Sequence, residues 1–425
     1  MSRSARRFRR DDLDLVALTA TAARHGVLHV GNQRTALGLG ELTAVELDPI
    51  SSVVSRSAIA QLLASIELDQ QPGAPSPRLH LAVPFLPGEP GCAWLAPIQI
   101  TASADGGIWV TLIADERPGL QVLEAELDAL QAGAEQKSTG DPGLLSVEED
   151  PDAAVYGQMV NAALEEISAG RLRKVVLSRS VHLTATMPLD AASVLERMAD
   201  REPSCVRYAH PSGTSRVVGA SPELVVERQG RQISSHPLAG TIGLSDGRDG
   251  GMALARSAKD LEEHRLVVDD IVGRLDGLVE KLSVPSAPRV VELRAVAHLG
   301  TAIEAELPAG SPVGLIDLLA AIHPTPAVGG VPTSEALSLI SSLEAPRGDF
   351  AGSVGWIDAE GDGIFHLAIR GASLSAERAT IRAGAGIVAG STSSGEIEET
   401  RVKLASIIEA VVPGASARLE ALSSF

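Results

Sequence analysis

The stretch that most constrains this chain is Arg382–Lys403, RAGAGIVAGSTSSGEIEETRVK, in which a glycine-rich turn leads into a helical pattern. Gly384 and Gly386 carry no side chain, so a ligand could reach the backbone N–H groups at these positions. Either Ser393 or Ser394 is suited to cap the first turn of the helix that follows. A bare backbone in front of a capped helix predicts an anion-binding site.

The same helix is predicted to carry acidic residues on one face. Glu396, Glu399 and Lys403 are spaced i, i+3 and i+7, so they share that face, and apolar residues occupy the opposite one. Two carboxylates one turn apart suit a hard cation such as Mg²⁺, which completes its octahedron with waters and substrate oxygens. The simpler interpretation of an isolated pair of this kind is a solvated charged face.

A second helical segment repeats this arrangement. Ser257–Leu282 is the longest helical pattern in the chain, and it places Asp260 and Glu263 at i and i+3. Two acidic helix faces that converge on one cation would hold Mg²⁺. The alternative is that Glu263 pairs locally with Lys259 or Arg265.

The composition argues against several classes of function. The 425 residues carry a net charge of −18, from 36 basic and 54 acidic residues, which argues against a nucleic-acid partner. No run of about 18 apolar residues predicts a membrane span. Two cysteines, Cys92 and Cys205, form neither a disulfide framework nor a metal quartet, which favours a reducing cytoplasm. The basic start MSRSARRFRR is interpreted as a mobile tail rather than a targeting peptide, because no apolar core follows it.

The chemical signals are concentrated after the first third of the chain. Residues 1–145 contain strand-like segments, Pro-Gly turns and a helix around Gln121–Ala132, which is typical of a scaffold. The polar stretch Ala134–Gly143 predicts a linker or surface loop. We therefore divide the chain into a variable N-terminal part, 1–145, and a region that carries the candidate site, 146–425.

Four polar residues of the second part are each open to two interpretations. Lys174 heads the strand Arg173–Leu183 and either extends to water or, in a closed cavity, acts as a base with a lowered pKa. Glu223 enters an apolar strand and either faces solvent or is a buried carboxyl with a raised pKa. His298 could hydrogen-bond a substrate or a neighbouring carbonyl. Arg370 could capture a carboxylate or form an ordinary ion pair.

Two loops are suited to line a pocket. His236–Gly243, HPLAGTIG, has small residues that allow a close approach of the backbone, although such loops are also ordinary strand-end turns. The segment HPTPAVGGVPT is stiffened by three prolines, and it is predicted to wall the pocket. Between these loops, Val290–Thr301 is predicted to be one strand.

Taken together, these motifs resemble those of the chorismate-utilising enzymes, a family of isochorismate, salicylate, anthranilate and aminodeoxychorismate synthases. In chain order they are RKVVLSR, GASPEL, HPLAGT, SAKDLEEHRLVVDDI, HLGT, HPTPAVGGVP, FAGSVGW, AIRGA and RAGAGIV with GEIEETRVKL. The resemblance covers roughly Asp152–Val412, and so many long motifs in one order are specific. It implies an α/β fold of the α+β type, in which two large antiparallel sheets pack together with helices outside. A Mg²⁺-dependent pocket for chorismate is implied between the sheets.

The resemblance also implies how the chemistry is divided. Lys174 matches the general base of the members that add water, because the members that add ammonia commonly have a non-basic residue there. Glu223 matches the general acid that protonates the departing hydroxyl group. The aminodeoxychorismate synthases have a nucleophilic lysine where this chain has Ala239, so a covalent intermediate at that position is excluded.

The implied metal and substrate contacts come from several motifs. Glu263 and Glu399 match the closest Mg²⁺ ligands, with Asp260 and Glu396 nearby. The implied substrate-binding residues are Gly240, Thr241, His298, Ala327, Phe350, Arg370, Gly384, Gly386 and Lys403.

The sequence departs from the family pattern at two of these positions. Phe350 stands where many relatives have tyrosine, which removes a hydroxyl contact to substrate and puts affinity in doubt more than reaction type. Asp260 is one methylene shorter than the glutamate of some relatives.

The expected activity is that of an isochorismate synthase, in a monomer without an amidotransferase subunit. Salicylate synthase is the nearest alternative, and Ala327 favours the isomerase because salicylate-forming relatives tend to have threonine there. An anthranilate synthase would require the amidotransferase partner, and Lys174 argues against it. A non-catalytic chorismate-binding module is the remaining alternative. The sequence leaves open whether the product would serve menaquinone or siderophore biosynthesis.

Overall fold

The largest sheet sets the frame of the computed structural model, which describes residues 3–31, 34–50, 52–102, 106–115, 117–133, 140, 142–244 and 250–415. Within these ranges it has 13 strands. In spatial order they are β10 (Leu144–Asp150), β11 (Lys174–Ala185), β25 (Arg378–Val388), β24 (Gly371–Ser375), β13 (Ser215–Ser221), β12 (Val206–Ser212), β2 (Val27–Val30), β3 (Thr35–Leu39), β8 (Ile98–Ala102), β9 (Ile108–Ala114), β1 (Arg3–Arg9) and β5 (Ile66–Leu68), with β21 (Gly330–Val331) beside β11.

A second large sheet and a small third sheet complete the β structure of these ranges. The second runs in the order β17 (Glu280–Ser283), β20 (Ile303–Glu306), β15 (Gln232–His236), β14 (Leu224–Gln229), β23 (Gly363–Leu367), β22 (Ser353–Asp358), β6 (Arg78–Val83), β7 (Gly91–Leu95) and β4 (Thr43–Leu47). The third consists of β16 (Leu238–Gly243), β19 (Val296–Gly300) and β18 (Arg289–Glu292).

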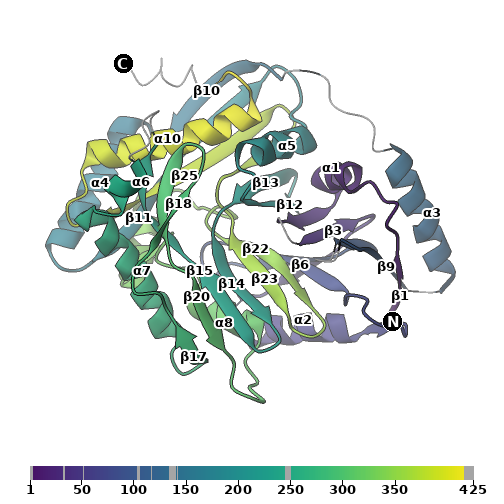
Figure 1. Ribbon diagram of the computed structural model, residues 1–425. Helices are drawn as coiled ribbons and strands as arrows, with labels where there is room; N and C mark the ends of the chain where they lie inside the picture. Colours follow the sequence, from purple (N-terminus) through teal and green to yellow (C-terminus); the bar gives the residue numbers. More distant parts are fainter. Residues whose placement is uncertain are drawn as a thin grey trace.

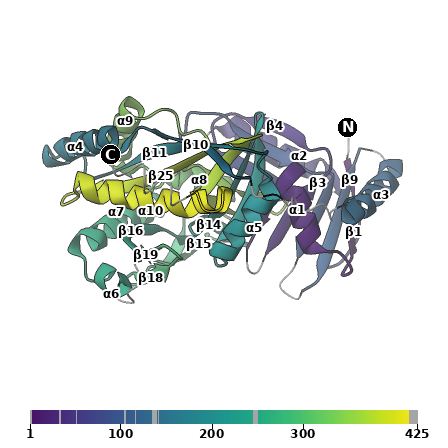
Figure 2. The same cartoon turned by 90° about the horizontal axis from the view of Figure 1, so that it is seen from above.

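Helices surround the sheets. They are α1 (Leu15–His25), α2 (Val53–Ala64), α3 (Arg117–Gly133), α4 (Ala153–Ser168), α5 (Ala191–Arg201), α6 (Gly250–Leu254), α7 (Ala258–Leu275), α8 (Leu315–Ile322), α9 (Thr333–Leu343) and α10 (Ser393–Val411). Figure 1 shows the helices outside the strands, and Figure 2 shows α1, α2 and α3 at one end of the molecule with α4, α7 and α9 at the other. In the part of the chain that the structure describes, no helix combines the length and apolarity needed to cross a membrane.

The predicted arrangement of two large antiparallel sheets is confirmed. Strands pair antiparallel, as β11 does with β25 and β22 does with β6, whereas β1 and β5 run parallel. One apolar core contains side chains from both sheets, including Leu177 of β11 and Phe365 of β23. A second core packs α1, α5 and α10 against the largest sheet.

The N-terminal segment corrects one prediction. Residues Arg3–Arg9 are not a mobile tail, because they form β1 and pair with β9 along six residues. Strands from residues 1–145 belong to both large sheets, and β10 runs across residue 145. The division at that residue stays a prediction, and the linker predicted at Ala134–Gly143 falls mostly outside the described residues.

Helix α10 is positioned by the strand that precedes it. β25 lies between β11 and β24, and α10 packs back against β25 and α4. The cap is Thr392, whose side chain accepts from the Gly395 N–H, so the predictions of Ser393 and Ser394 as caps are wrong by one or two residues.

Three predicted elements have different bounds from those expected. Helix α7 ends at Leu275 because Gly277 adopts φ +79°, a conformation that favours glycine and stops the helix. Val290–Thr301 is a hairpin of β18 and β19 rather than one strand. His236–Gly243 is mostly strand β16, with a break in register at Ala239–Thr241 where Gly240 has φ +74°.

Buried histidines cross the interface between the two large sheets. His29 of β2 contacts His366 of β23 at 3.0 Å between Nε2 and Nδ1, and His80 lies nearby on β6. Burial lowers the pKa of His80 and of His366 to about 3, and it holds the pKa of His29 well below its ordinary value. The folded protein therefore keeps these rings neutral.

These rings predict a loss of stability in mild acid. Above pH 6.5 the histidines are neutral in both states, but as the pH falls toward 3 only the unfolded chain takes up their protons. Each ring should lower the free energy of unfolding by about 1.4 kcal/mol per pH unit in that window. Chemical denaturation between pH 7 and pH 5 checks this, with His80→Gln expected to have a shallower slope. An equal slope in the variant would contradict the prediction.

Candidate active site

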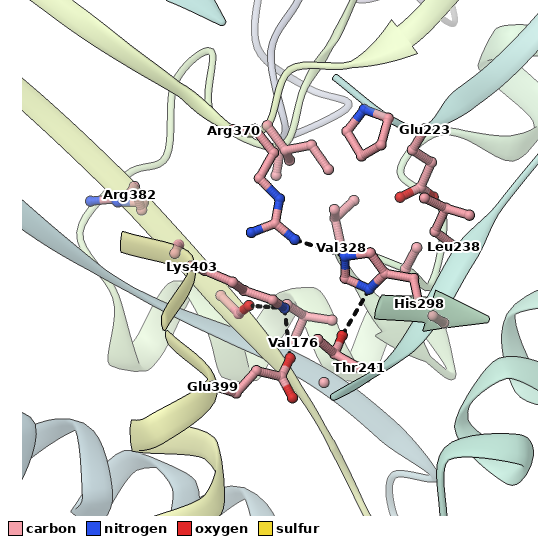
Figure 3. A pocket seen from close by; sticks show the side chains of 18 of the residues that line it. Val176, Glu223, Leu238, Thr241, His298, Val328, Arg370, Arg382, Glu399 and Lys403 are labelled. Carbon is pink, nitrogen blue, oxygen red and sulfur yellow. Dashed lines mark hydrogen bonds and ion pairs between the residues drawn. The ribbon is translucent and has the colours of Figure 1, made fainter. Parts of the chain in front are cut away.

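A cavity lies where β11, β16, β25, α7 and α10 meet, with about 700 Å³ of empty space when the solvent at its opening is included. Its lining includes most of the predicted site residues. Those that line it are Glu223, Thr241, Glu263, His298, Ala327, Phe350, Arg370, Gly384, Gly386, Glu399 and Lys403. Four predicted residues are absent from the lining, namely Lys174, Gly240, Asp260 and Glu396. Figure 3 shows the labelled side chains that converge on this space.

Lys174 is buried directly behind the cavity wall. The side chain has no exposed surface, which excludes a strand-edge lysine that extends to water. Its Nζ lies 3.1 Å from Oε1 of Glu263, which does line the cavity. Burial is the largest effect and would raise the pKa of Glu263, but the cations of Lys174, Lys259 and Lys403 together hold that pKa below its ordinary value. The local alternative that paired Glu263 with Lys259 or Arg265 is therefore wrong.

Gly386 provides the space that this pair needs. A Cβ at this position would overlap Oε1 of Glu263 and would lie 3.2 Å from Cε of Lys174. Replacing Gly386 with alanine is therefore expected to displace the Glu263 carboxylate and to weaken Mg²⁺ affinity by about 10–100-fold. Titration of Mg²⁺ by calorimetry checks this, and Gly88→Ala, where a Cβ would meet nothing within 4 Å, is a control outside the cavity. Unchanged Mg²⁺ affinity in Gly386→Ala would contradict the explanation.

Glu223 is a buried carboxyl directly before β14. Only 4% of the residue is exposed, so the interpretation as a solvent-facing residue of an alternating strand is wrong. Burial raises the pKa of Glu223 to about 8, although the Leu238 N–H and the cations of Lys174, Arg370 and Lys403 oppose that rise. The group therefore holds a proton at neutral pH, as a general acid must.

Arg370, His298 and Thr241 form a chain of hydrogen bonds across the cavity (Figure 3). Nη2 of Arg370 lies 2.8 Å from Nε2 of His298, and Nδ1 of His298 lies 3.0 Å from Oγ1 of Thr241. An arginine can only donate, so Nε2 of His298 accepts and Nδ1 carries the proton that is donated to Thr241. Burial, then Arg370 and Lys403, hold the pKa of His298 well below its ordinary value, which agrees with this neutral ring.

The backbone of Arg370 is held in an uncommon conformation. Its φ is +55°, in the left-handed region that few residues other than glycine adopt. The carbonyls on either side are fixed, because Tyr208 Oη donates to Ile369 O at 3.0 Å and the Ala220 N–H donates to Arg370 O at 3.1 Å. Within the described residues no carboxylate pairs with Arg370, so the ordinary ion pair of the sequence interpretation is not formed.

The acidic face of α10 is packed rather than solvated. Glu396 is 1% exposed, and its Oε1 pairs with Lys259 at 2.9 Å, while its Oε2 makes no hydrogen bond to the residues that the structure describes. Burial first, and then the neighbouring Glu399, raise the pKa of Glu396. Lys403 donates to Glu399 at 2.6 Å and to the Gly384 carbonyl at 2.9 Å.

Two of the four predicted carboxylates are placed where they could bind a hard divalent cation. Glu263 and Glu399 both line the cavity, and Mg²⁺ needs only one or two protein carboxylates beside waters and substrate oxygens. The unpartnered Oε2 of Glu396 behind Glu399 also favours a nearby cation. Among the described residues no group of three or more acidic, histidine or cysteine side chains closes on one point. Asp260 instead packs against Gly240, so neither is placed on the cavity surface.

Two arginines of the site have no predicted role. Arg347 is buried and holds the cavity wall through Glu344, Val328 O and Val176 O. Arg382 lines the cavity from β25, two residues before Gly384. The sequence could have predicted that Arg382 lies in the site, because residues two apart in a strand share a face and Gly384 was already assigned to it. No local pattern predicts the position of Arg347.

The fold and this cavity define an enzyme with a small pocket lined by carboxyl and guanidinium groups. A family model described as chorismate binding enzyme matches residues 99–412, and the chain belongs to that family. It is 43% identical over 277 residues to a putative isochorismate synthase MenF of Mycobacterium tuberculosis, a match that covers 61% of this chain and 74% of the relative.

Two further relatives agree with this family. The chain is 37% identical over 273 residues to the isochorismate synthase DhbC of Bacillus subtilis, with 61% of this chain and 68% of the relative covered. The solved structure of a putative 2,3-dihydroxybenzoate-specific isochorismate synthase, DhbC from Bacillus anthracis, superposes with a TM-score of 0.77 at 29% identity. That match covers 94% of this chain and 99% of the solved chain.

Proposed function

We propose that the protein is a Mg²⁺-dependent isochorismate synthase, which converts chorismate reversibly to isochorismate. The observation that carries this proposal is the buried Glu223, whose pKa of about 8 leaves it protonated in the same cavity as Arg370 and Glu263. The names of the relatives support the same reaction. The site residues of the sequence prediction remain proposals for their individual roles.

In this mechanism water attacks C2 of chorismate as the hydroxyl group leaves C4 and the ring double bonds shift. Lys174 accepts a proton from the attacking water, and Glu223 donates a proton to the leaving hydroxyl, so the exchange is balanced. Before the next turnover Lys174 must lose that proton and separate from Glu263, and Glu223 must take up a proton again. Arg370 binds one carboxylate of the substrate in bidentate form, with its orientation fixed by His298.

A metal ion would supply a charge that the residues cannot supply alone. Glu263 and Glu399 would hold Mg²⁺, which would bind the ring carboxylate of chorismate and orient the ring. Lys174 and Lys403 pair with these two carboxylates. The three lysines that pair with Glu263, Glu396 and Glu399 thus keep the acidic cluster neutral.

Product analysis tests the proposal. The protein is incubated with chorismate and Mg²⁺, and the products are separated by chromatography, with salicylate detected by its fluorescence. Isochorismate as the product supports the proposal, whereas strong salicylate production without a partner lyase would assign the alternative, a salicylate synthase. No turnover of chorismate with either water or ammonia would favour a non-catalytic binding module.

Three further properties belong to the proposal. We infer a cytoplasmic enzyme that works as a monomer without an amidotransferase subunit. Cys92 and Cys205 are both free thiols, which agrees with a reducing compartment. The relatives named MenF and DhbC leave menaquinone and siderophore biosynthesis equally open as the use of the product.

A further inference from the structure

Among the described residues, Arg382 is the one cation of the cavity lining besides Arg370 that forms no ion pair. Lys403 pairs with Glu399, and Arg347 pairs with Glu344, so these cations are already neutralised. Arg382 forms no ion pair with any carboxylate of the described residues, and its hydrogen bonds go to a hydroxyl and two carbonyls. Within the part of the chain that the structure describes, the cavity therefore has two guanidinium groups that form no direct ion pair, although carboxylates such as Glu344 act on Arg382 from a greater distance.

The guanidinium group of Arg382 is held by hydrogen bonds from two of its three nitrogens. Its Nε donates to Ser180 Oγ at 2.8 Å, and its Nη1 donates to Ala345 O and Pro346 O at 3.3 and 3.1 Å. Nη2 makes no hydrogen bond to any residue that the structure describes. Because a guanidinium group is planar, three bonds on two nitrogens fix the direction of the third.

Arg382 lies between the cavity and a second hollow on the protein, and it lines both. That hollow has a volume of about 860 Å³, and it shares only Arg347, Phe350 and Arg382 with the cavity lining. Pro346 and Thr380, which also line the hollow, are exposed, so it opens to solvent. Figure 3 shows Arg382 on the side of the cavity away from Glu223.

Arg382 also continues the row of residues that the anion site uses. Arg382, Gly384 and Gly386 alternate on β25, so they share one face at a spacing of roughly 7 Å. Lys403 donates to the Gly384 carbonyl at 2.9 Å, so the row leads from Arg382 to the Lys403 ammonium group. The hollow is also lined by one acidic residue, Asp349, whose carboxylate accepts a hydrogen bond from Ser212 Oγ at 2.5 Å.

We propose that Arg382 is the entry residue for the dianionic substrate, which it captures by a carboxylate at the mouth of the cavity and passes to Arg370 and Lys403. This inference extends the proposed function, since it concerns how chorismate reaches the site. The protein is strongly acidic, with a net charge of −18, so an unpaired guanidinium at the mouth supplies attraction that the rest of the surface opposes. Burial lowers the pKa of Arg382, but the guanidinium group stays charged.

The test is the association rate of chorismate, measured by stopped-flow tryptophan fluorescence in a Glu223→Gln background that blocks turnover. Arg382→Gln is compared with Arg378→Gln, which removes one charge from the exposed start of the same strand. We expect Arg382→Gln to lower the association rate constant about tenfold at low ionic strength and to make it less dependent on salt. Arg378→Gln should change neither, and Arg382→Lys should recover most of the rate.

Two outcomes would overturn this role. Equal association rates in the two glutamine variants would show that Arg382 does not steer the substrate. A change confined to the dissociation rate would place Arg382 in the bound complex rather than at the entrance. Because binding is measured without turnover, the product analysis with the wild-type protein tests the proposed function separately.

Discussion

Replacing Lys174 with methionine is expected to lower kcat by about 10²–10⁴-fold, because water cannot attack C2 without a base to take its proton. Methionine keeps the length of the side chain in a site that has no exposed surface, but it removes the amine. Steady-state rates of isochorismate formation measure the effect. A variant with near-normal turnover would remove Lys174 from the mechanism.

The same change should also destabilise the fold, so a second variant separates the two effects. Lys174→Met leaves the buried carboxylate of Glu263 without its partner at 3.1 Å, which costs about 3–5 kcal/mol. The double variant Lys174→Met/Glu263→Gln removes that unpaired charge and is expected to recover most of the stability in chemical denaturation. Turnover in the double variant should stay as low as in Lys174→Met, and recovery of activity would contradict the role of Lys174.

Replacing Glu223 with glutamine is expected to lower kcat by a similar factor, because glutamine has the same shape but cannot donate a proton to the leaving hydroxyl. In the wild-type enzyme, kcat/KM should fall as the pH rises through about 8, where Glu223 loses its proton. The pH profile of the residual activity in Glu223→Gln should lack that fall. If kcat/KM of the variant still falls above about pH 8, another group must cause that fall.

The stability of Glu223→Gln gives an independent check, because the same change that lowers activity should raise stability at alkaline pH. Burial holds the pKa of Glu223 above its unfolded value of 4.5, so the folded state binds a proton that the unfolded state releases. The wild-type protein should therefore lose about 1.4 kcal/mol of stability per pH unit between 4.5 and 8, relative to the variant. Denaturation at pH 5 and pH 8 measures this difference. A variant less stable than the wild type at pH 8 would contradict the buried acid.

Much of the site could be predicted from the sequence because it consists of motifs with local signals. Glu223 stands between Pro222 and an apolar strand, and this placement predicts either of two environments that only burial can distinguish. The pair Glu396 and Glu399 is one helical turn apart, which fixes a shared face but not what that face packs against. The resemblance to a known family joined these separate signals into one pocket.

The parts that could not be predicted depend on contacts between distant segments. Lys174 pairs with Glu263 because β11 and α7 meet in the fold, and no spacing in the sequence reports that contact. The turn between β18 and β19 contains Leu293 and Arg294, without the glycine or proline that would mark it. The end of α7 did have such a signal in Gly277, and its apolar neighbours Leu275 and Leu278 concealed it.

The source of the product's hydroxyl oxygen tests the central claim most directly, since the proposed mechanism replaces one hydroxyl group by another from water. The reaction is run in oxygen-18 water, and the isochorismate formed is analysed by mass spectrometry with fragmentation to locate the label. The roles of Lys174 and Glu223 predict one oxygen-18 atom at C2 of every product molecule formed in a single forward conversion. Unlabelled isochorismate would mean that the original hydroxyl group moves within the substrate, which would contradict the proposed base and acid.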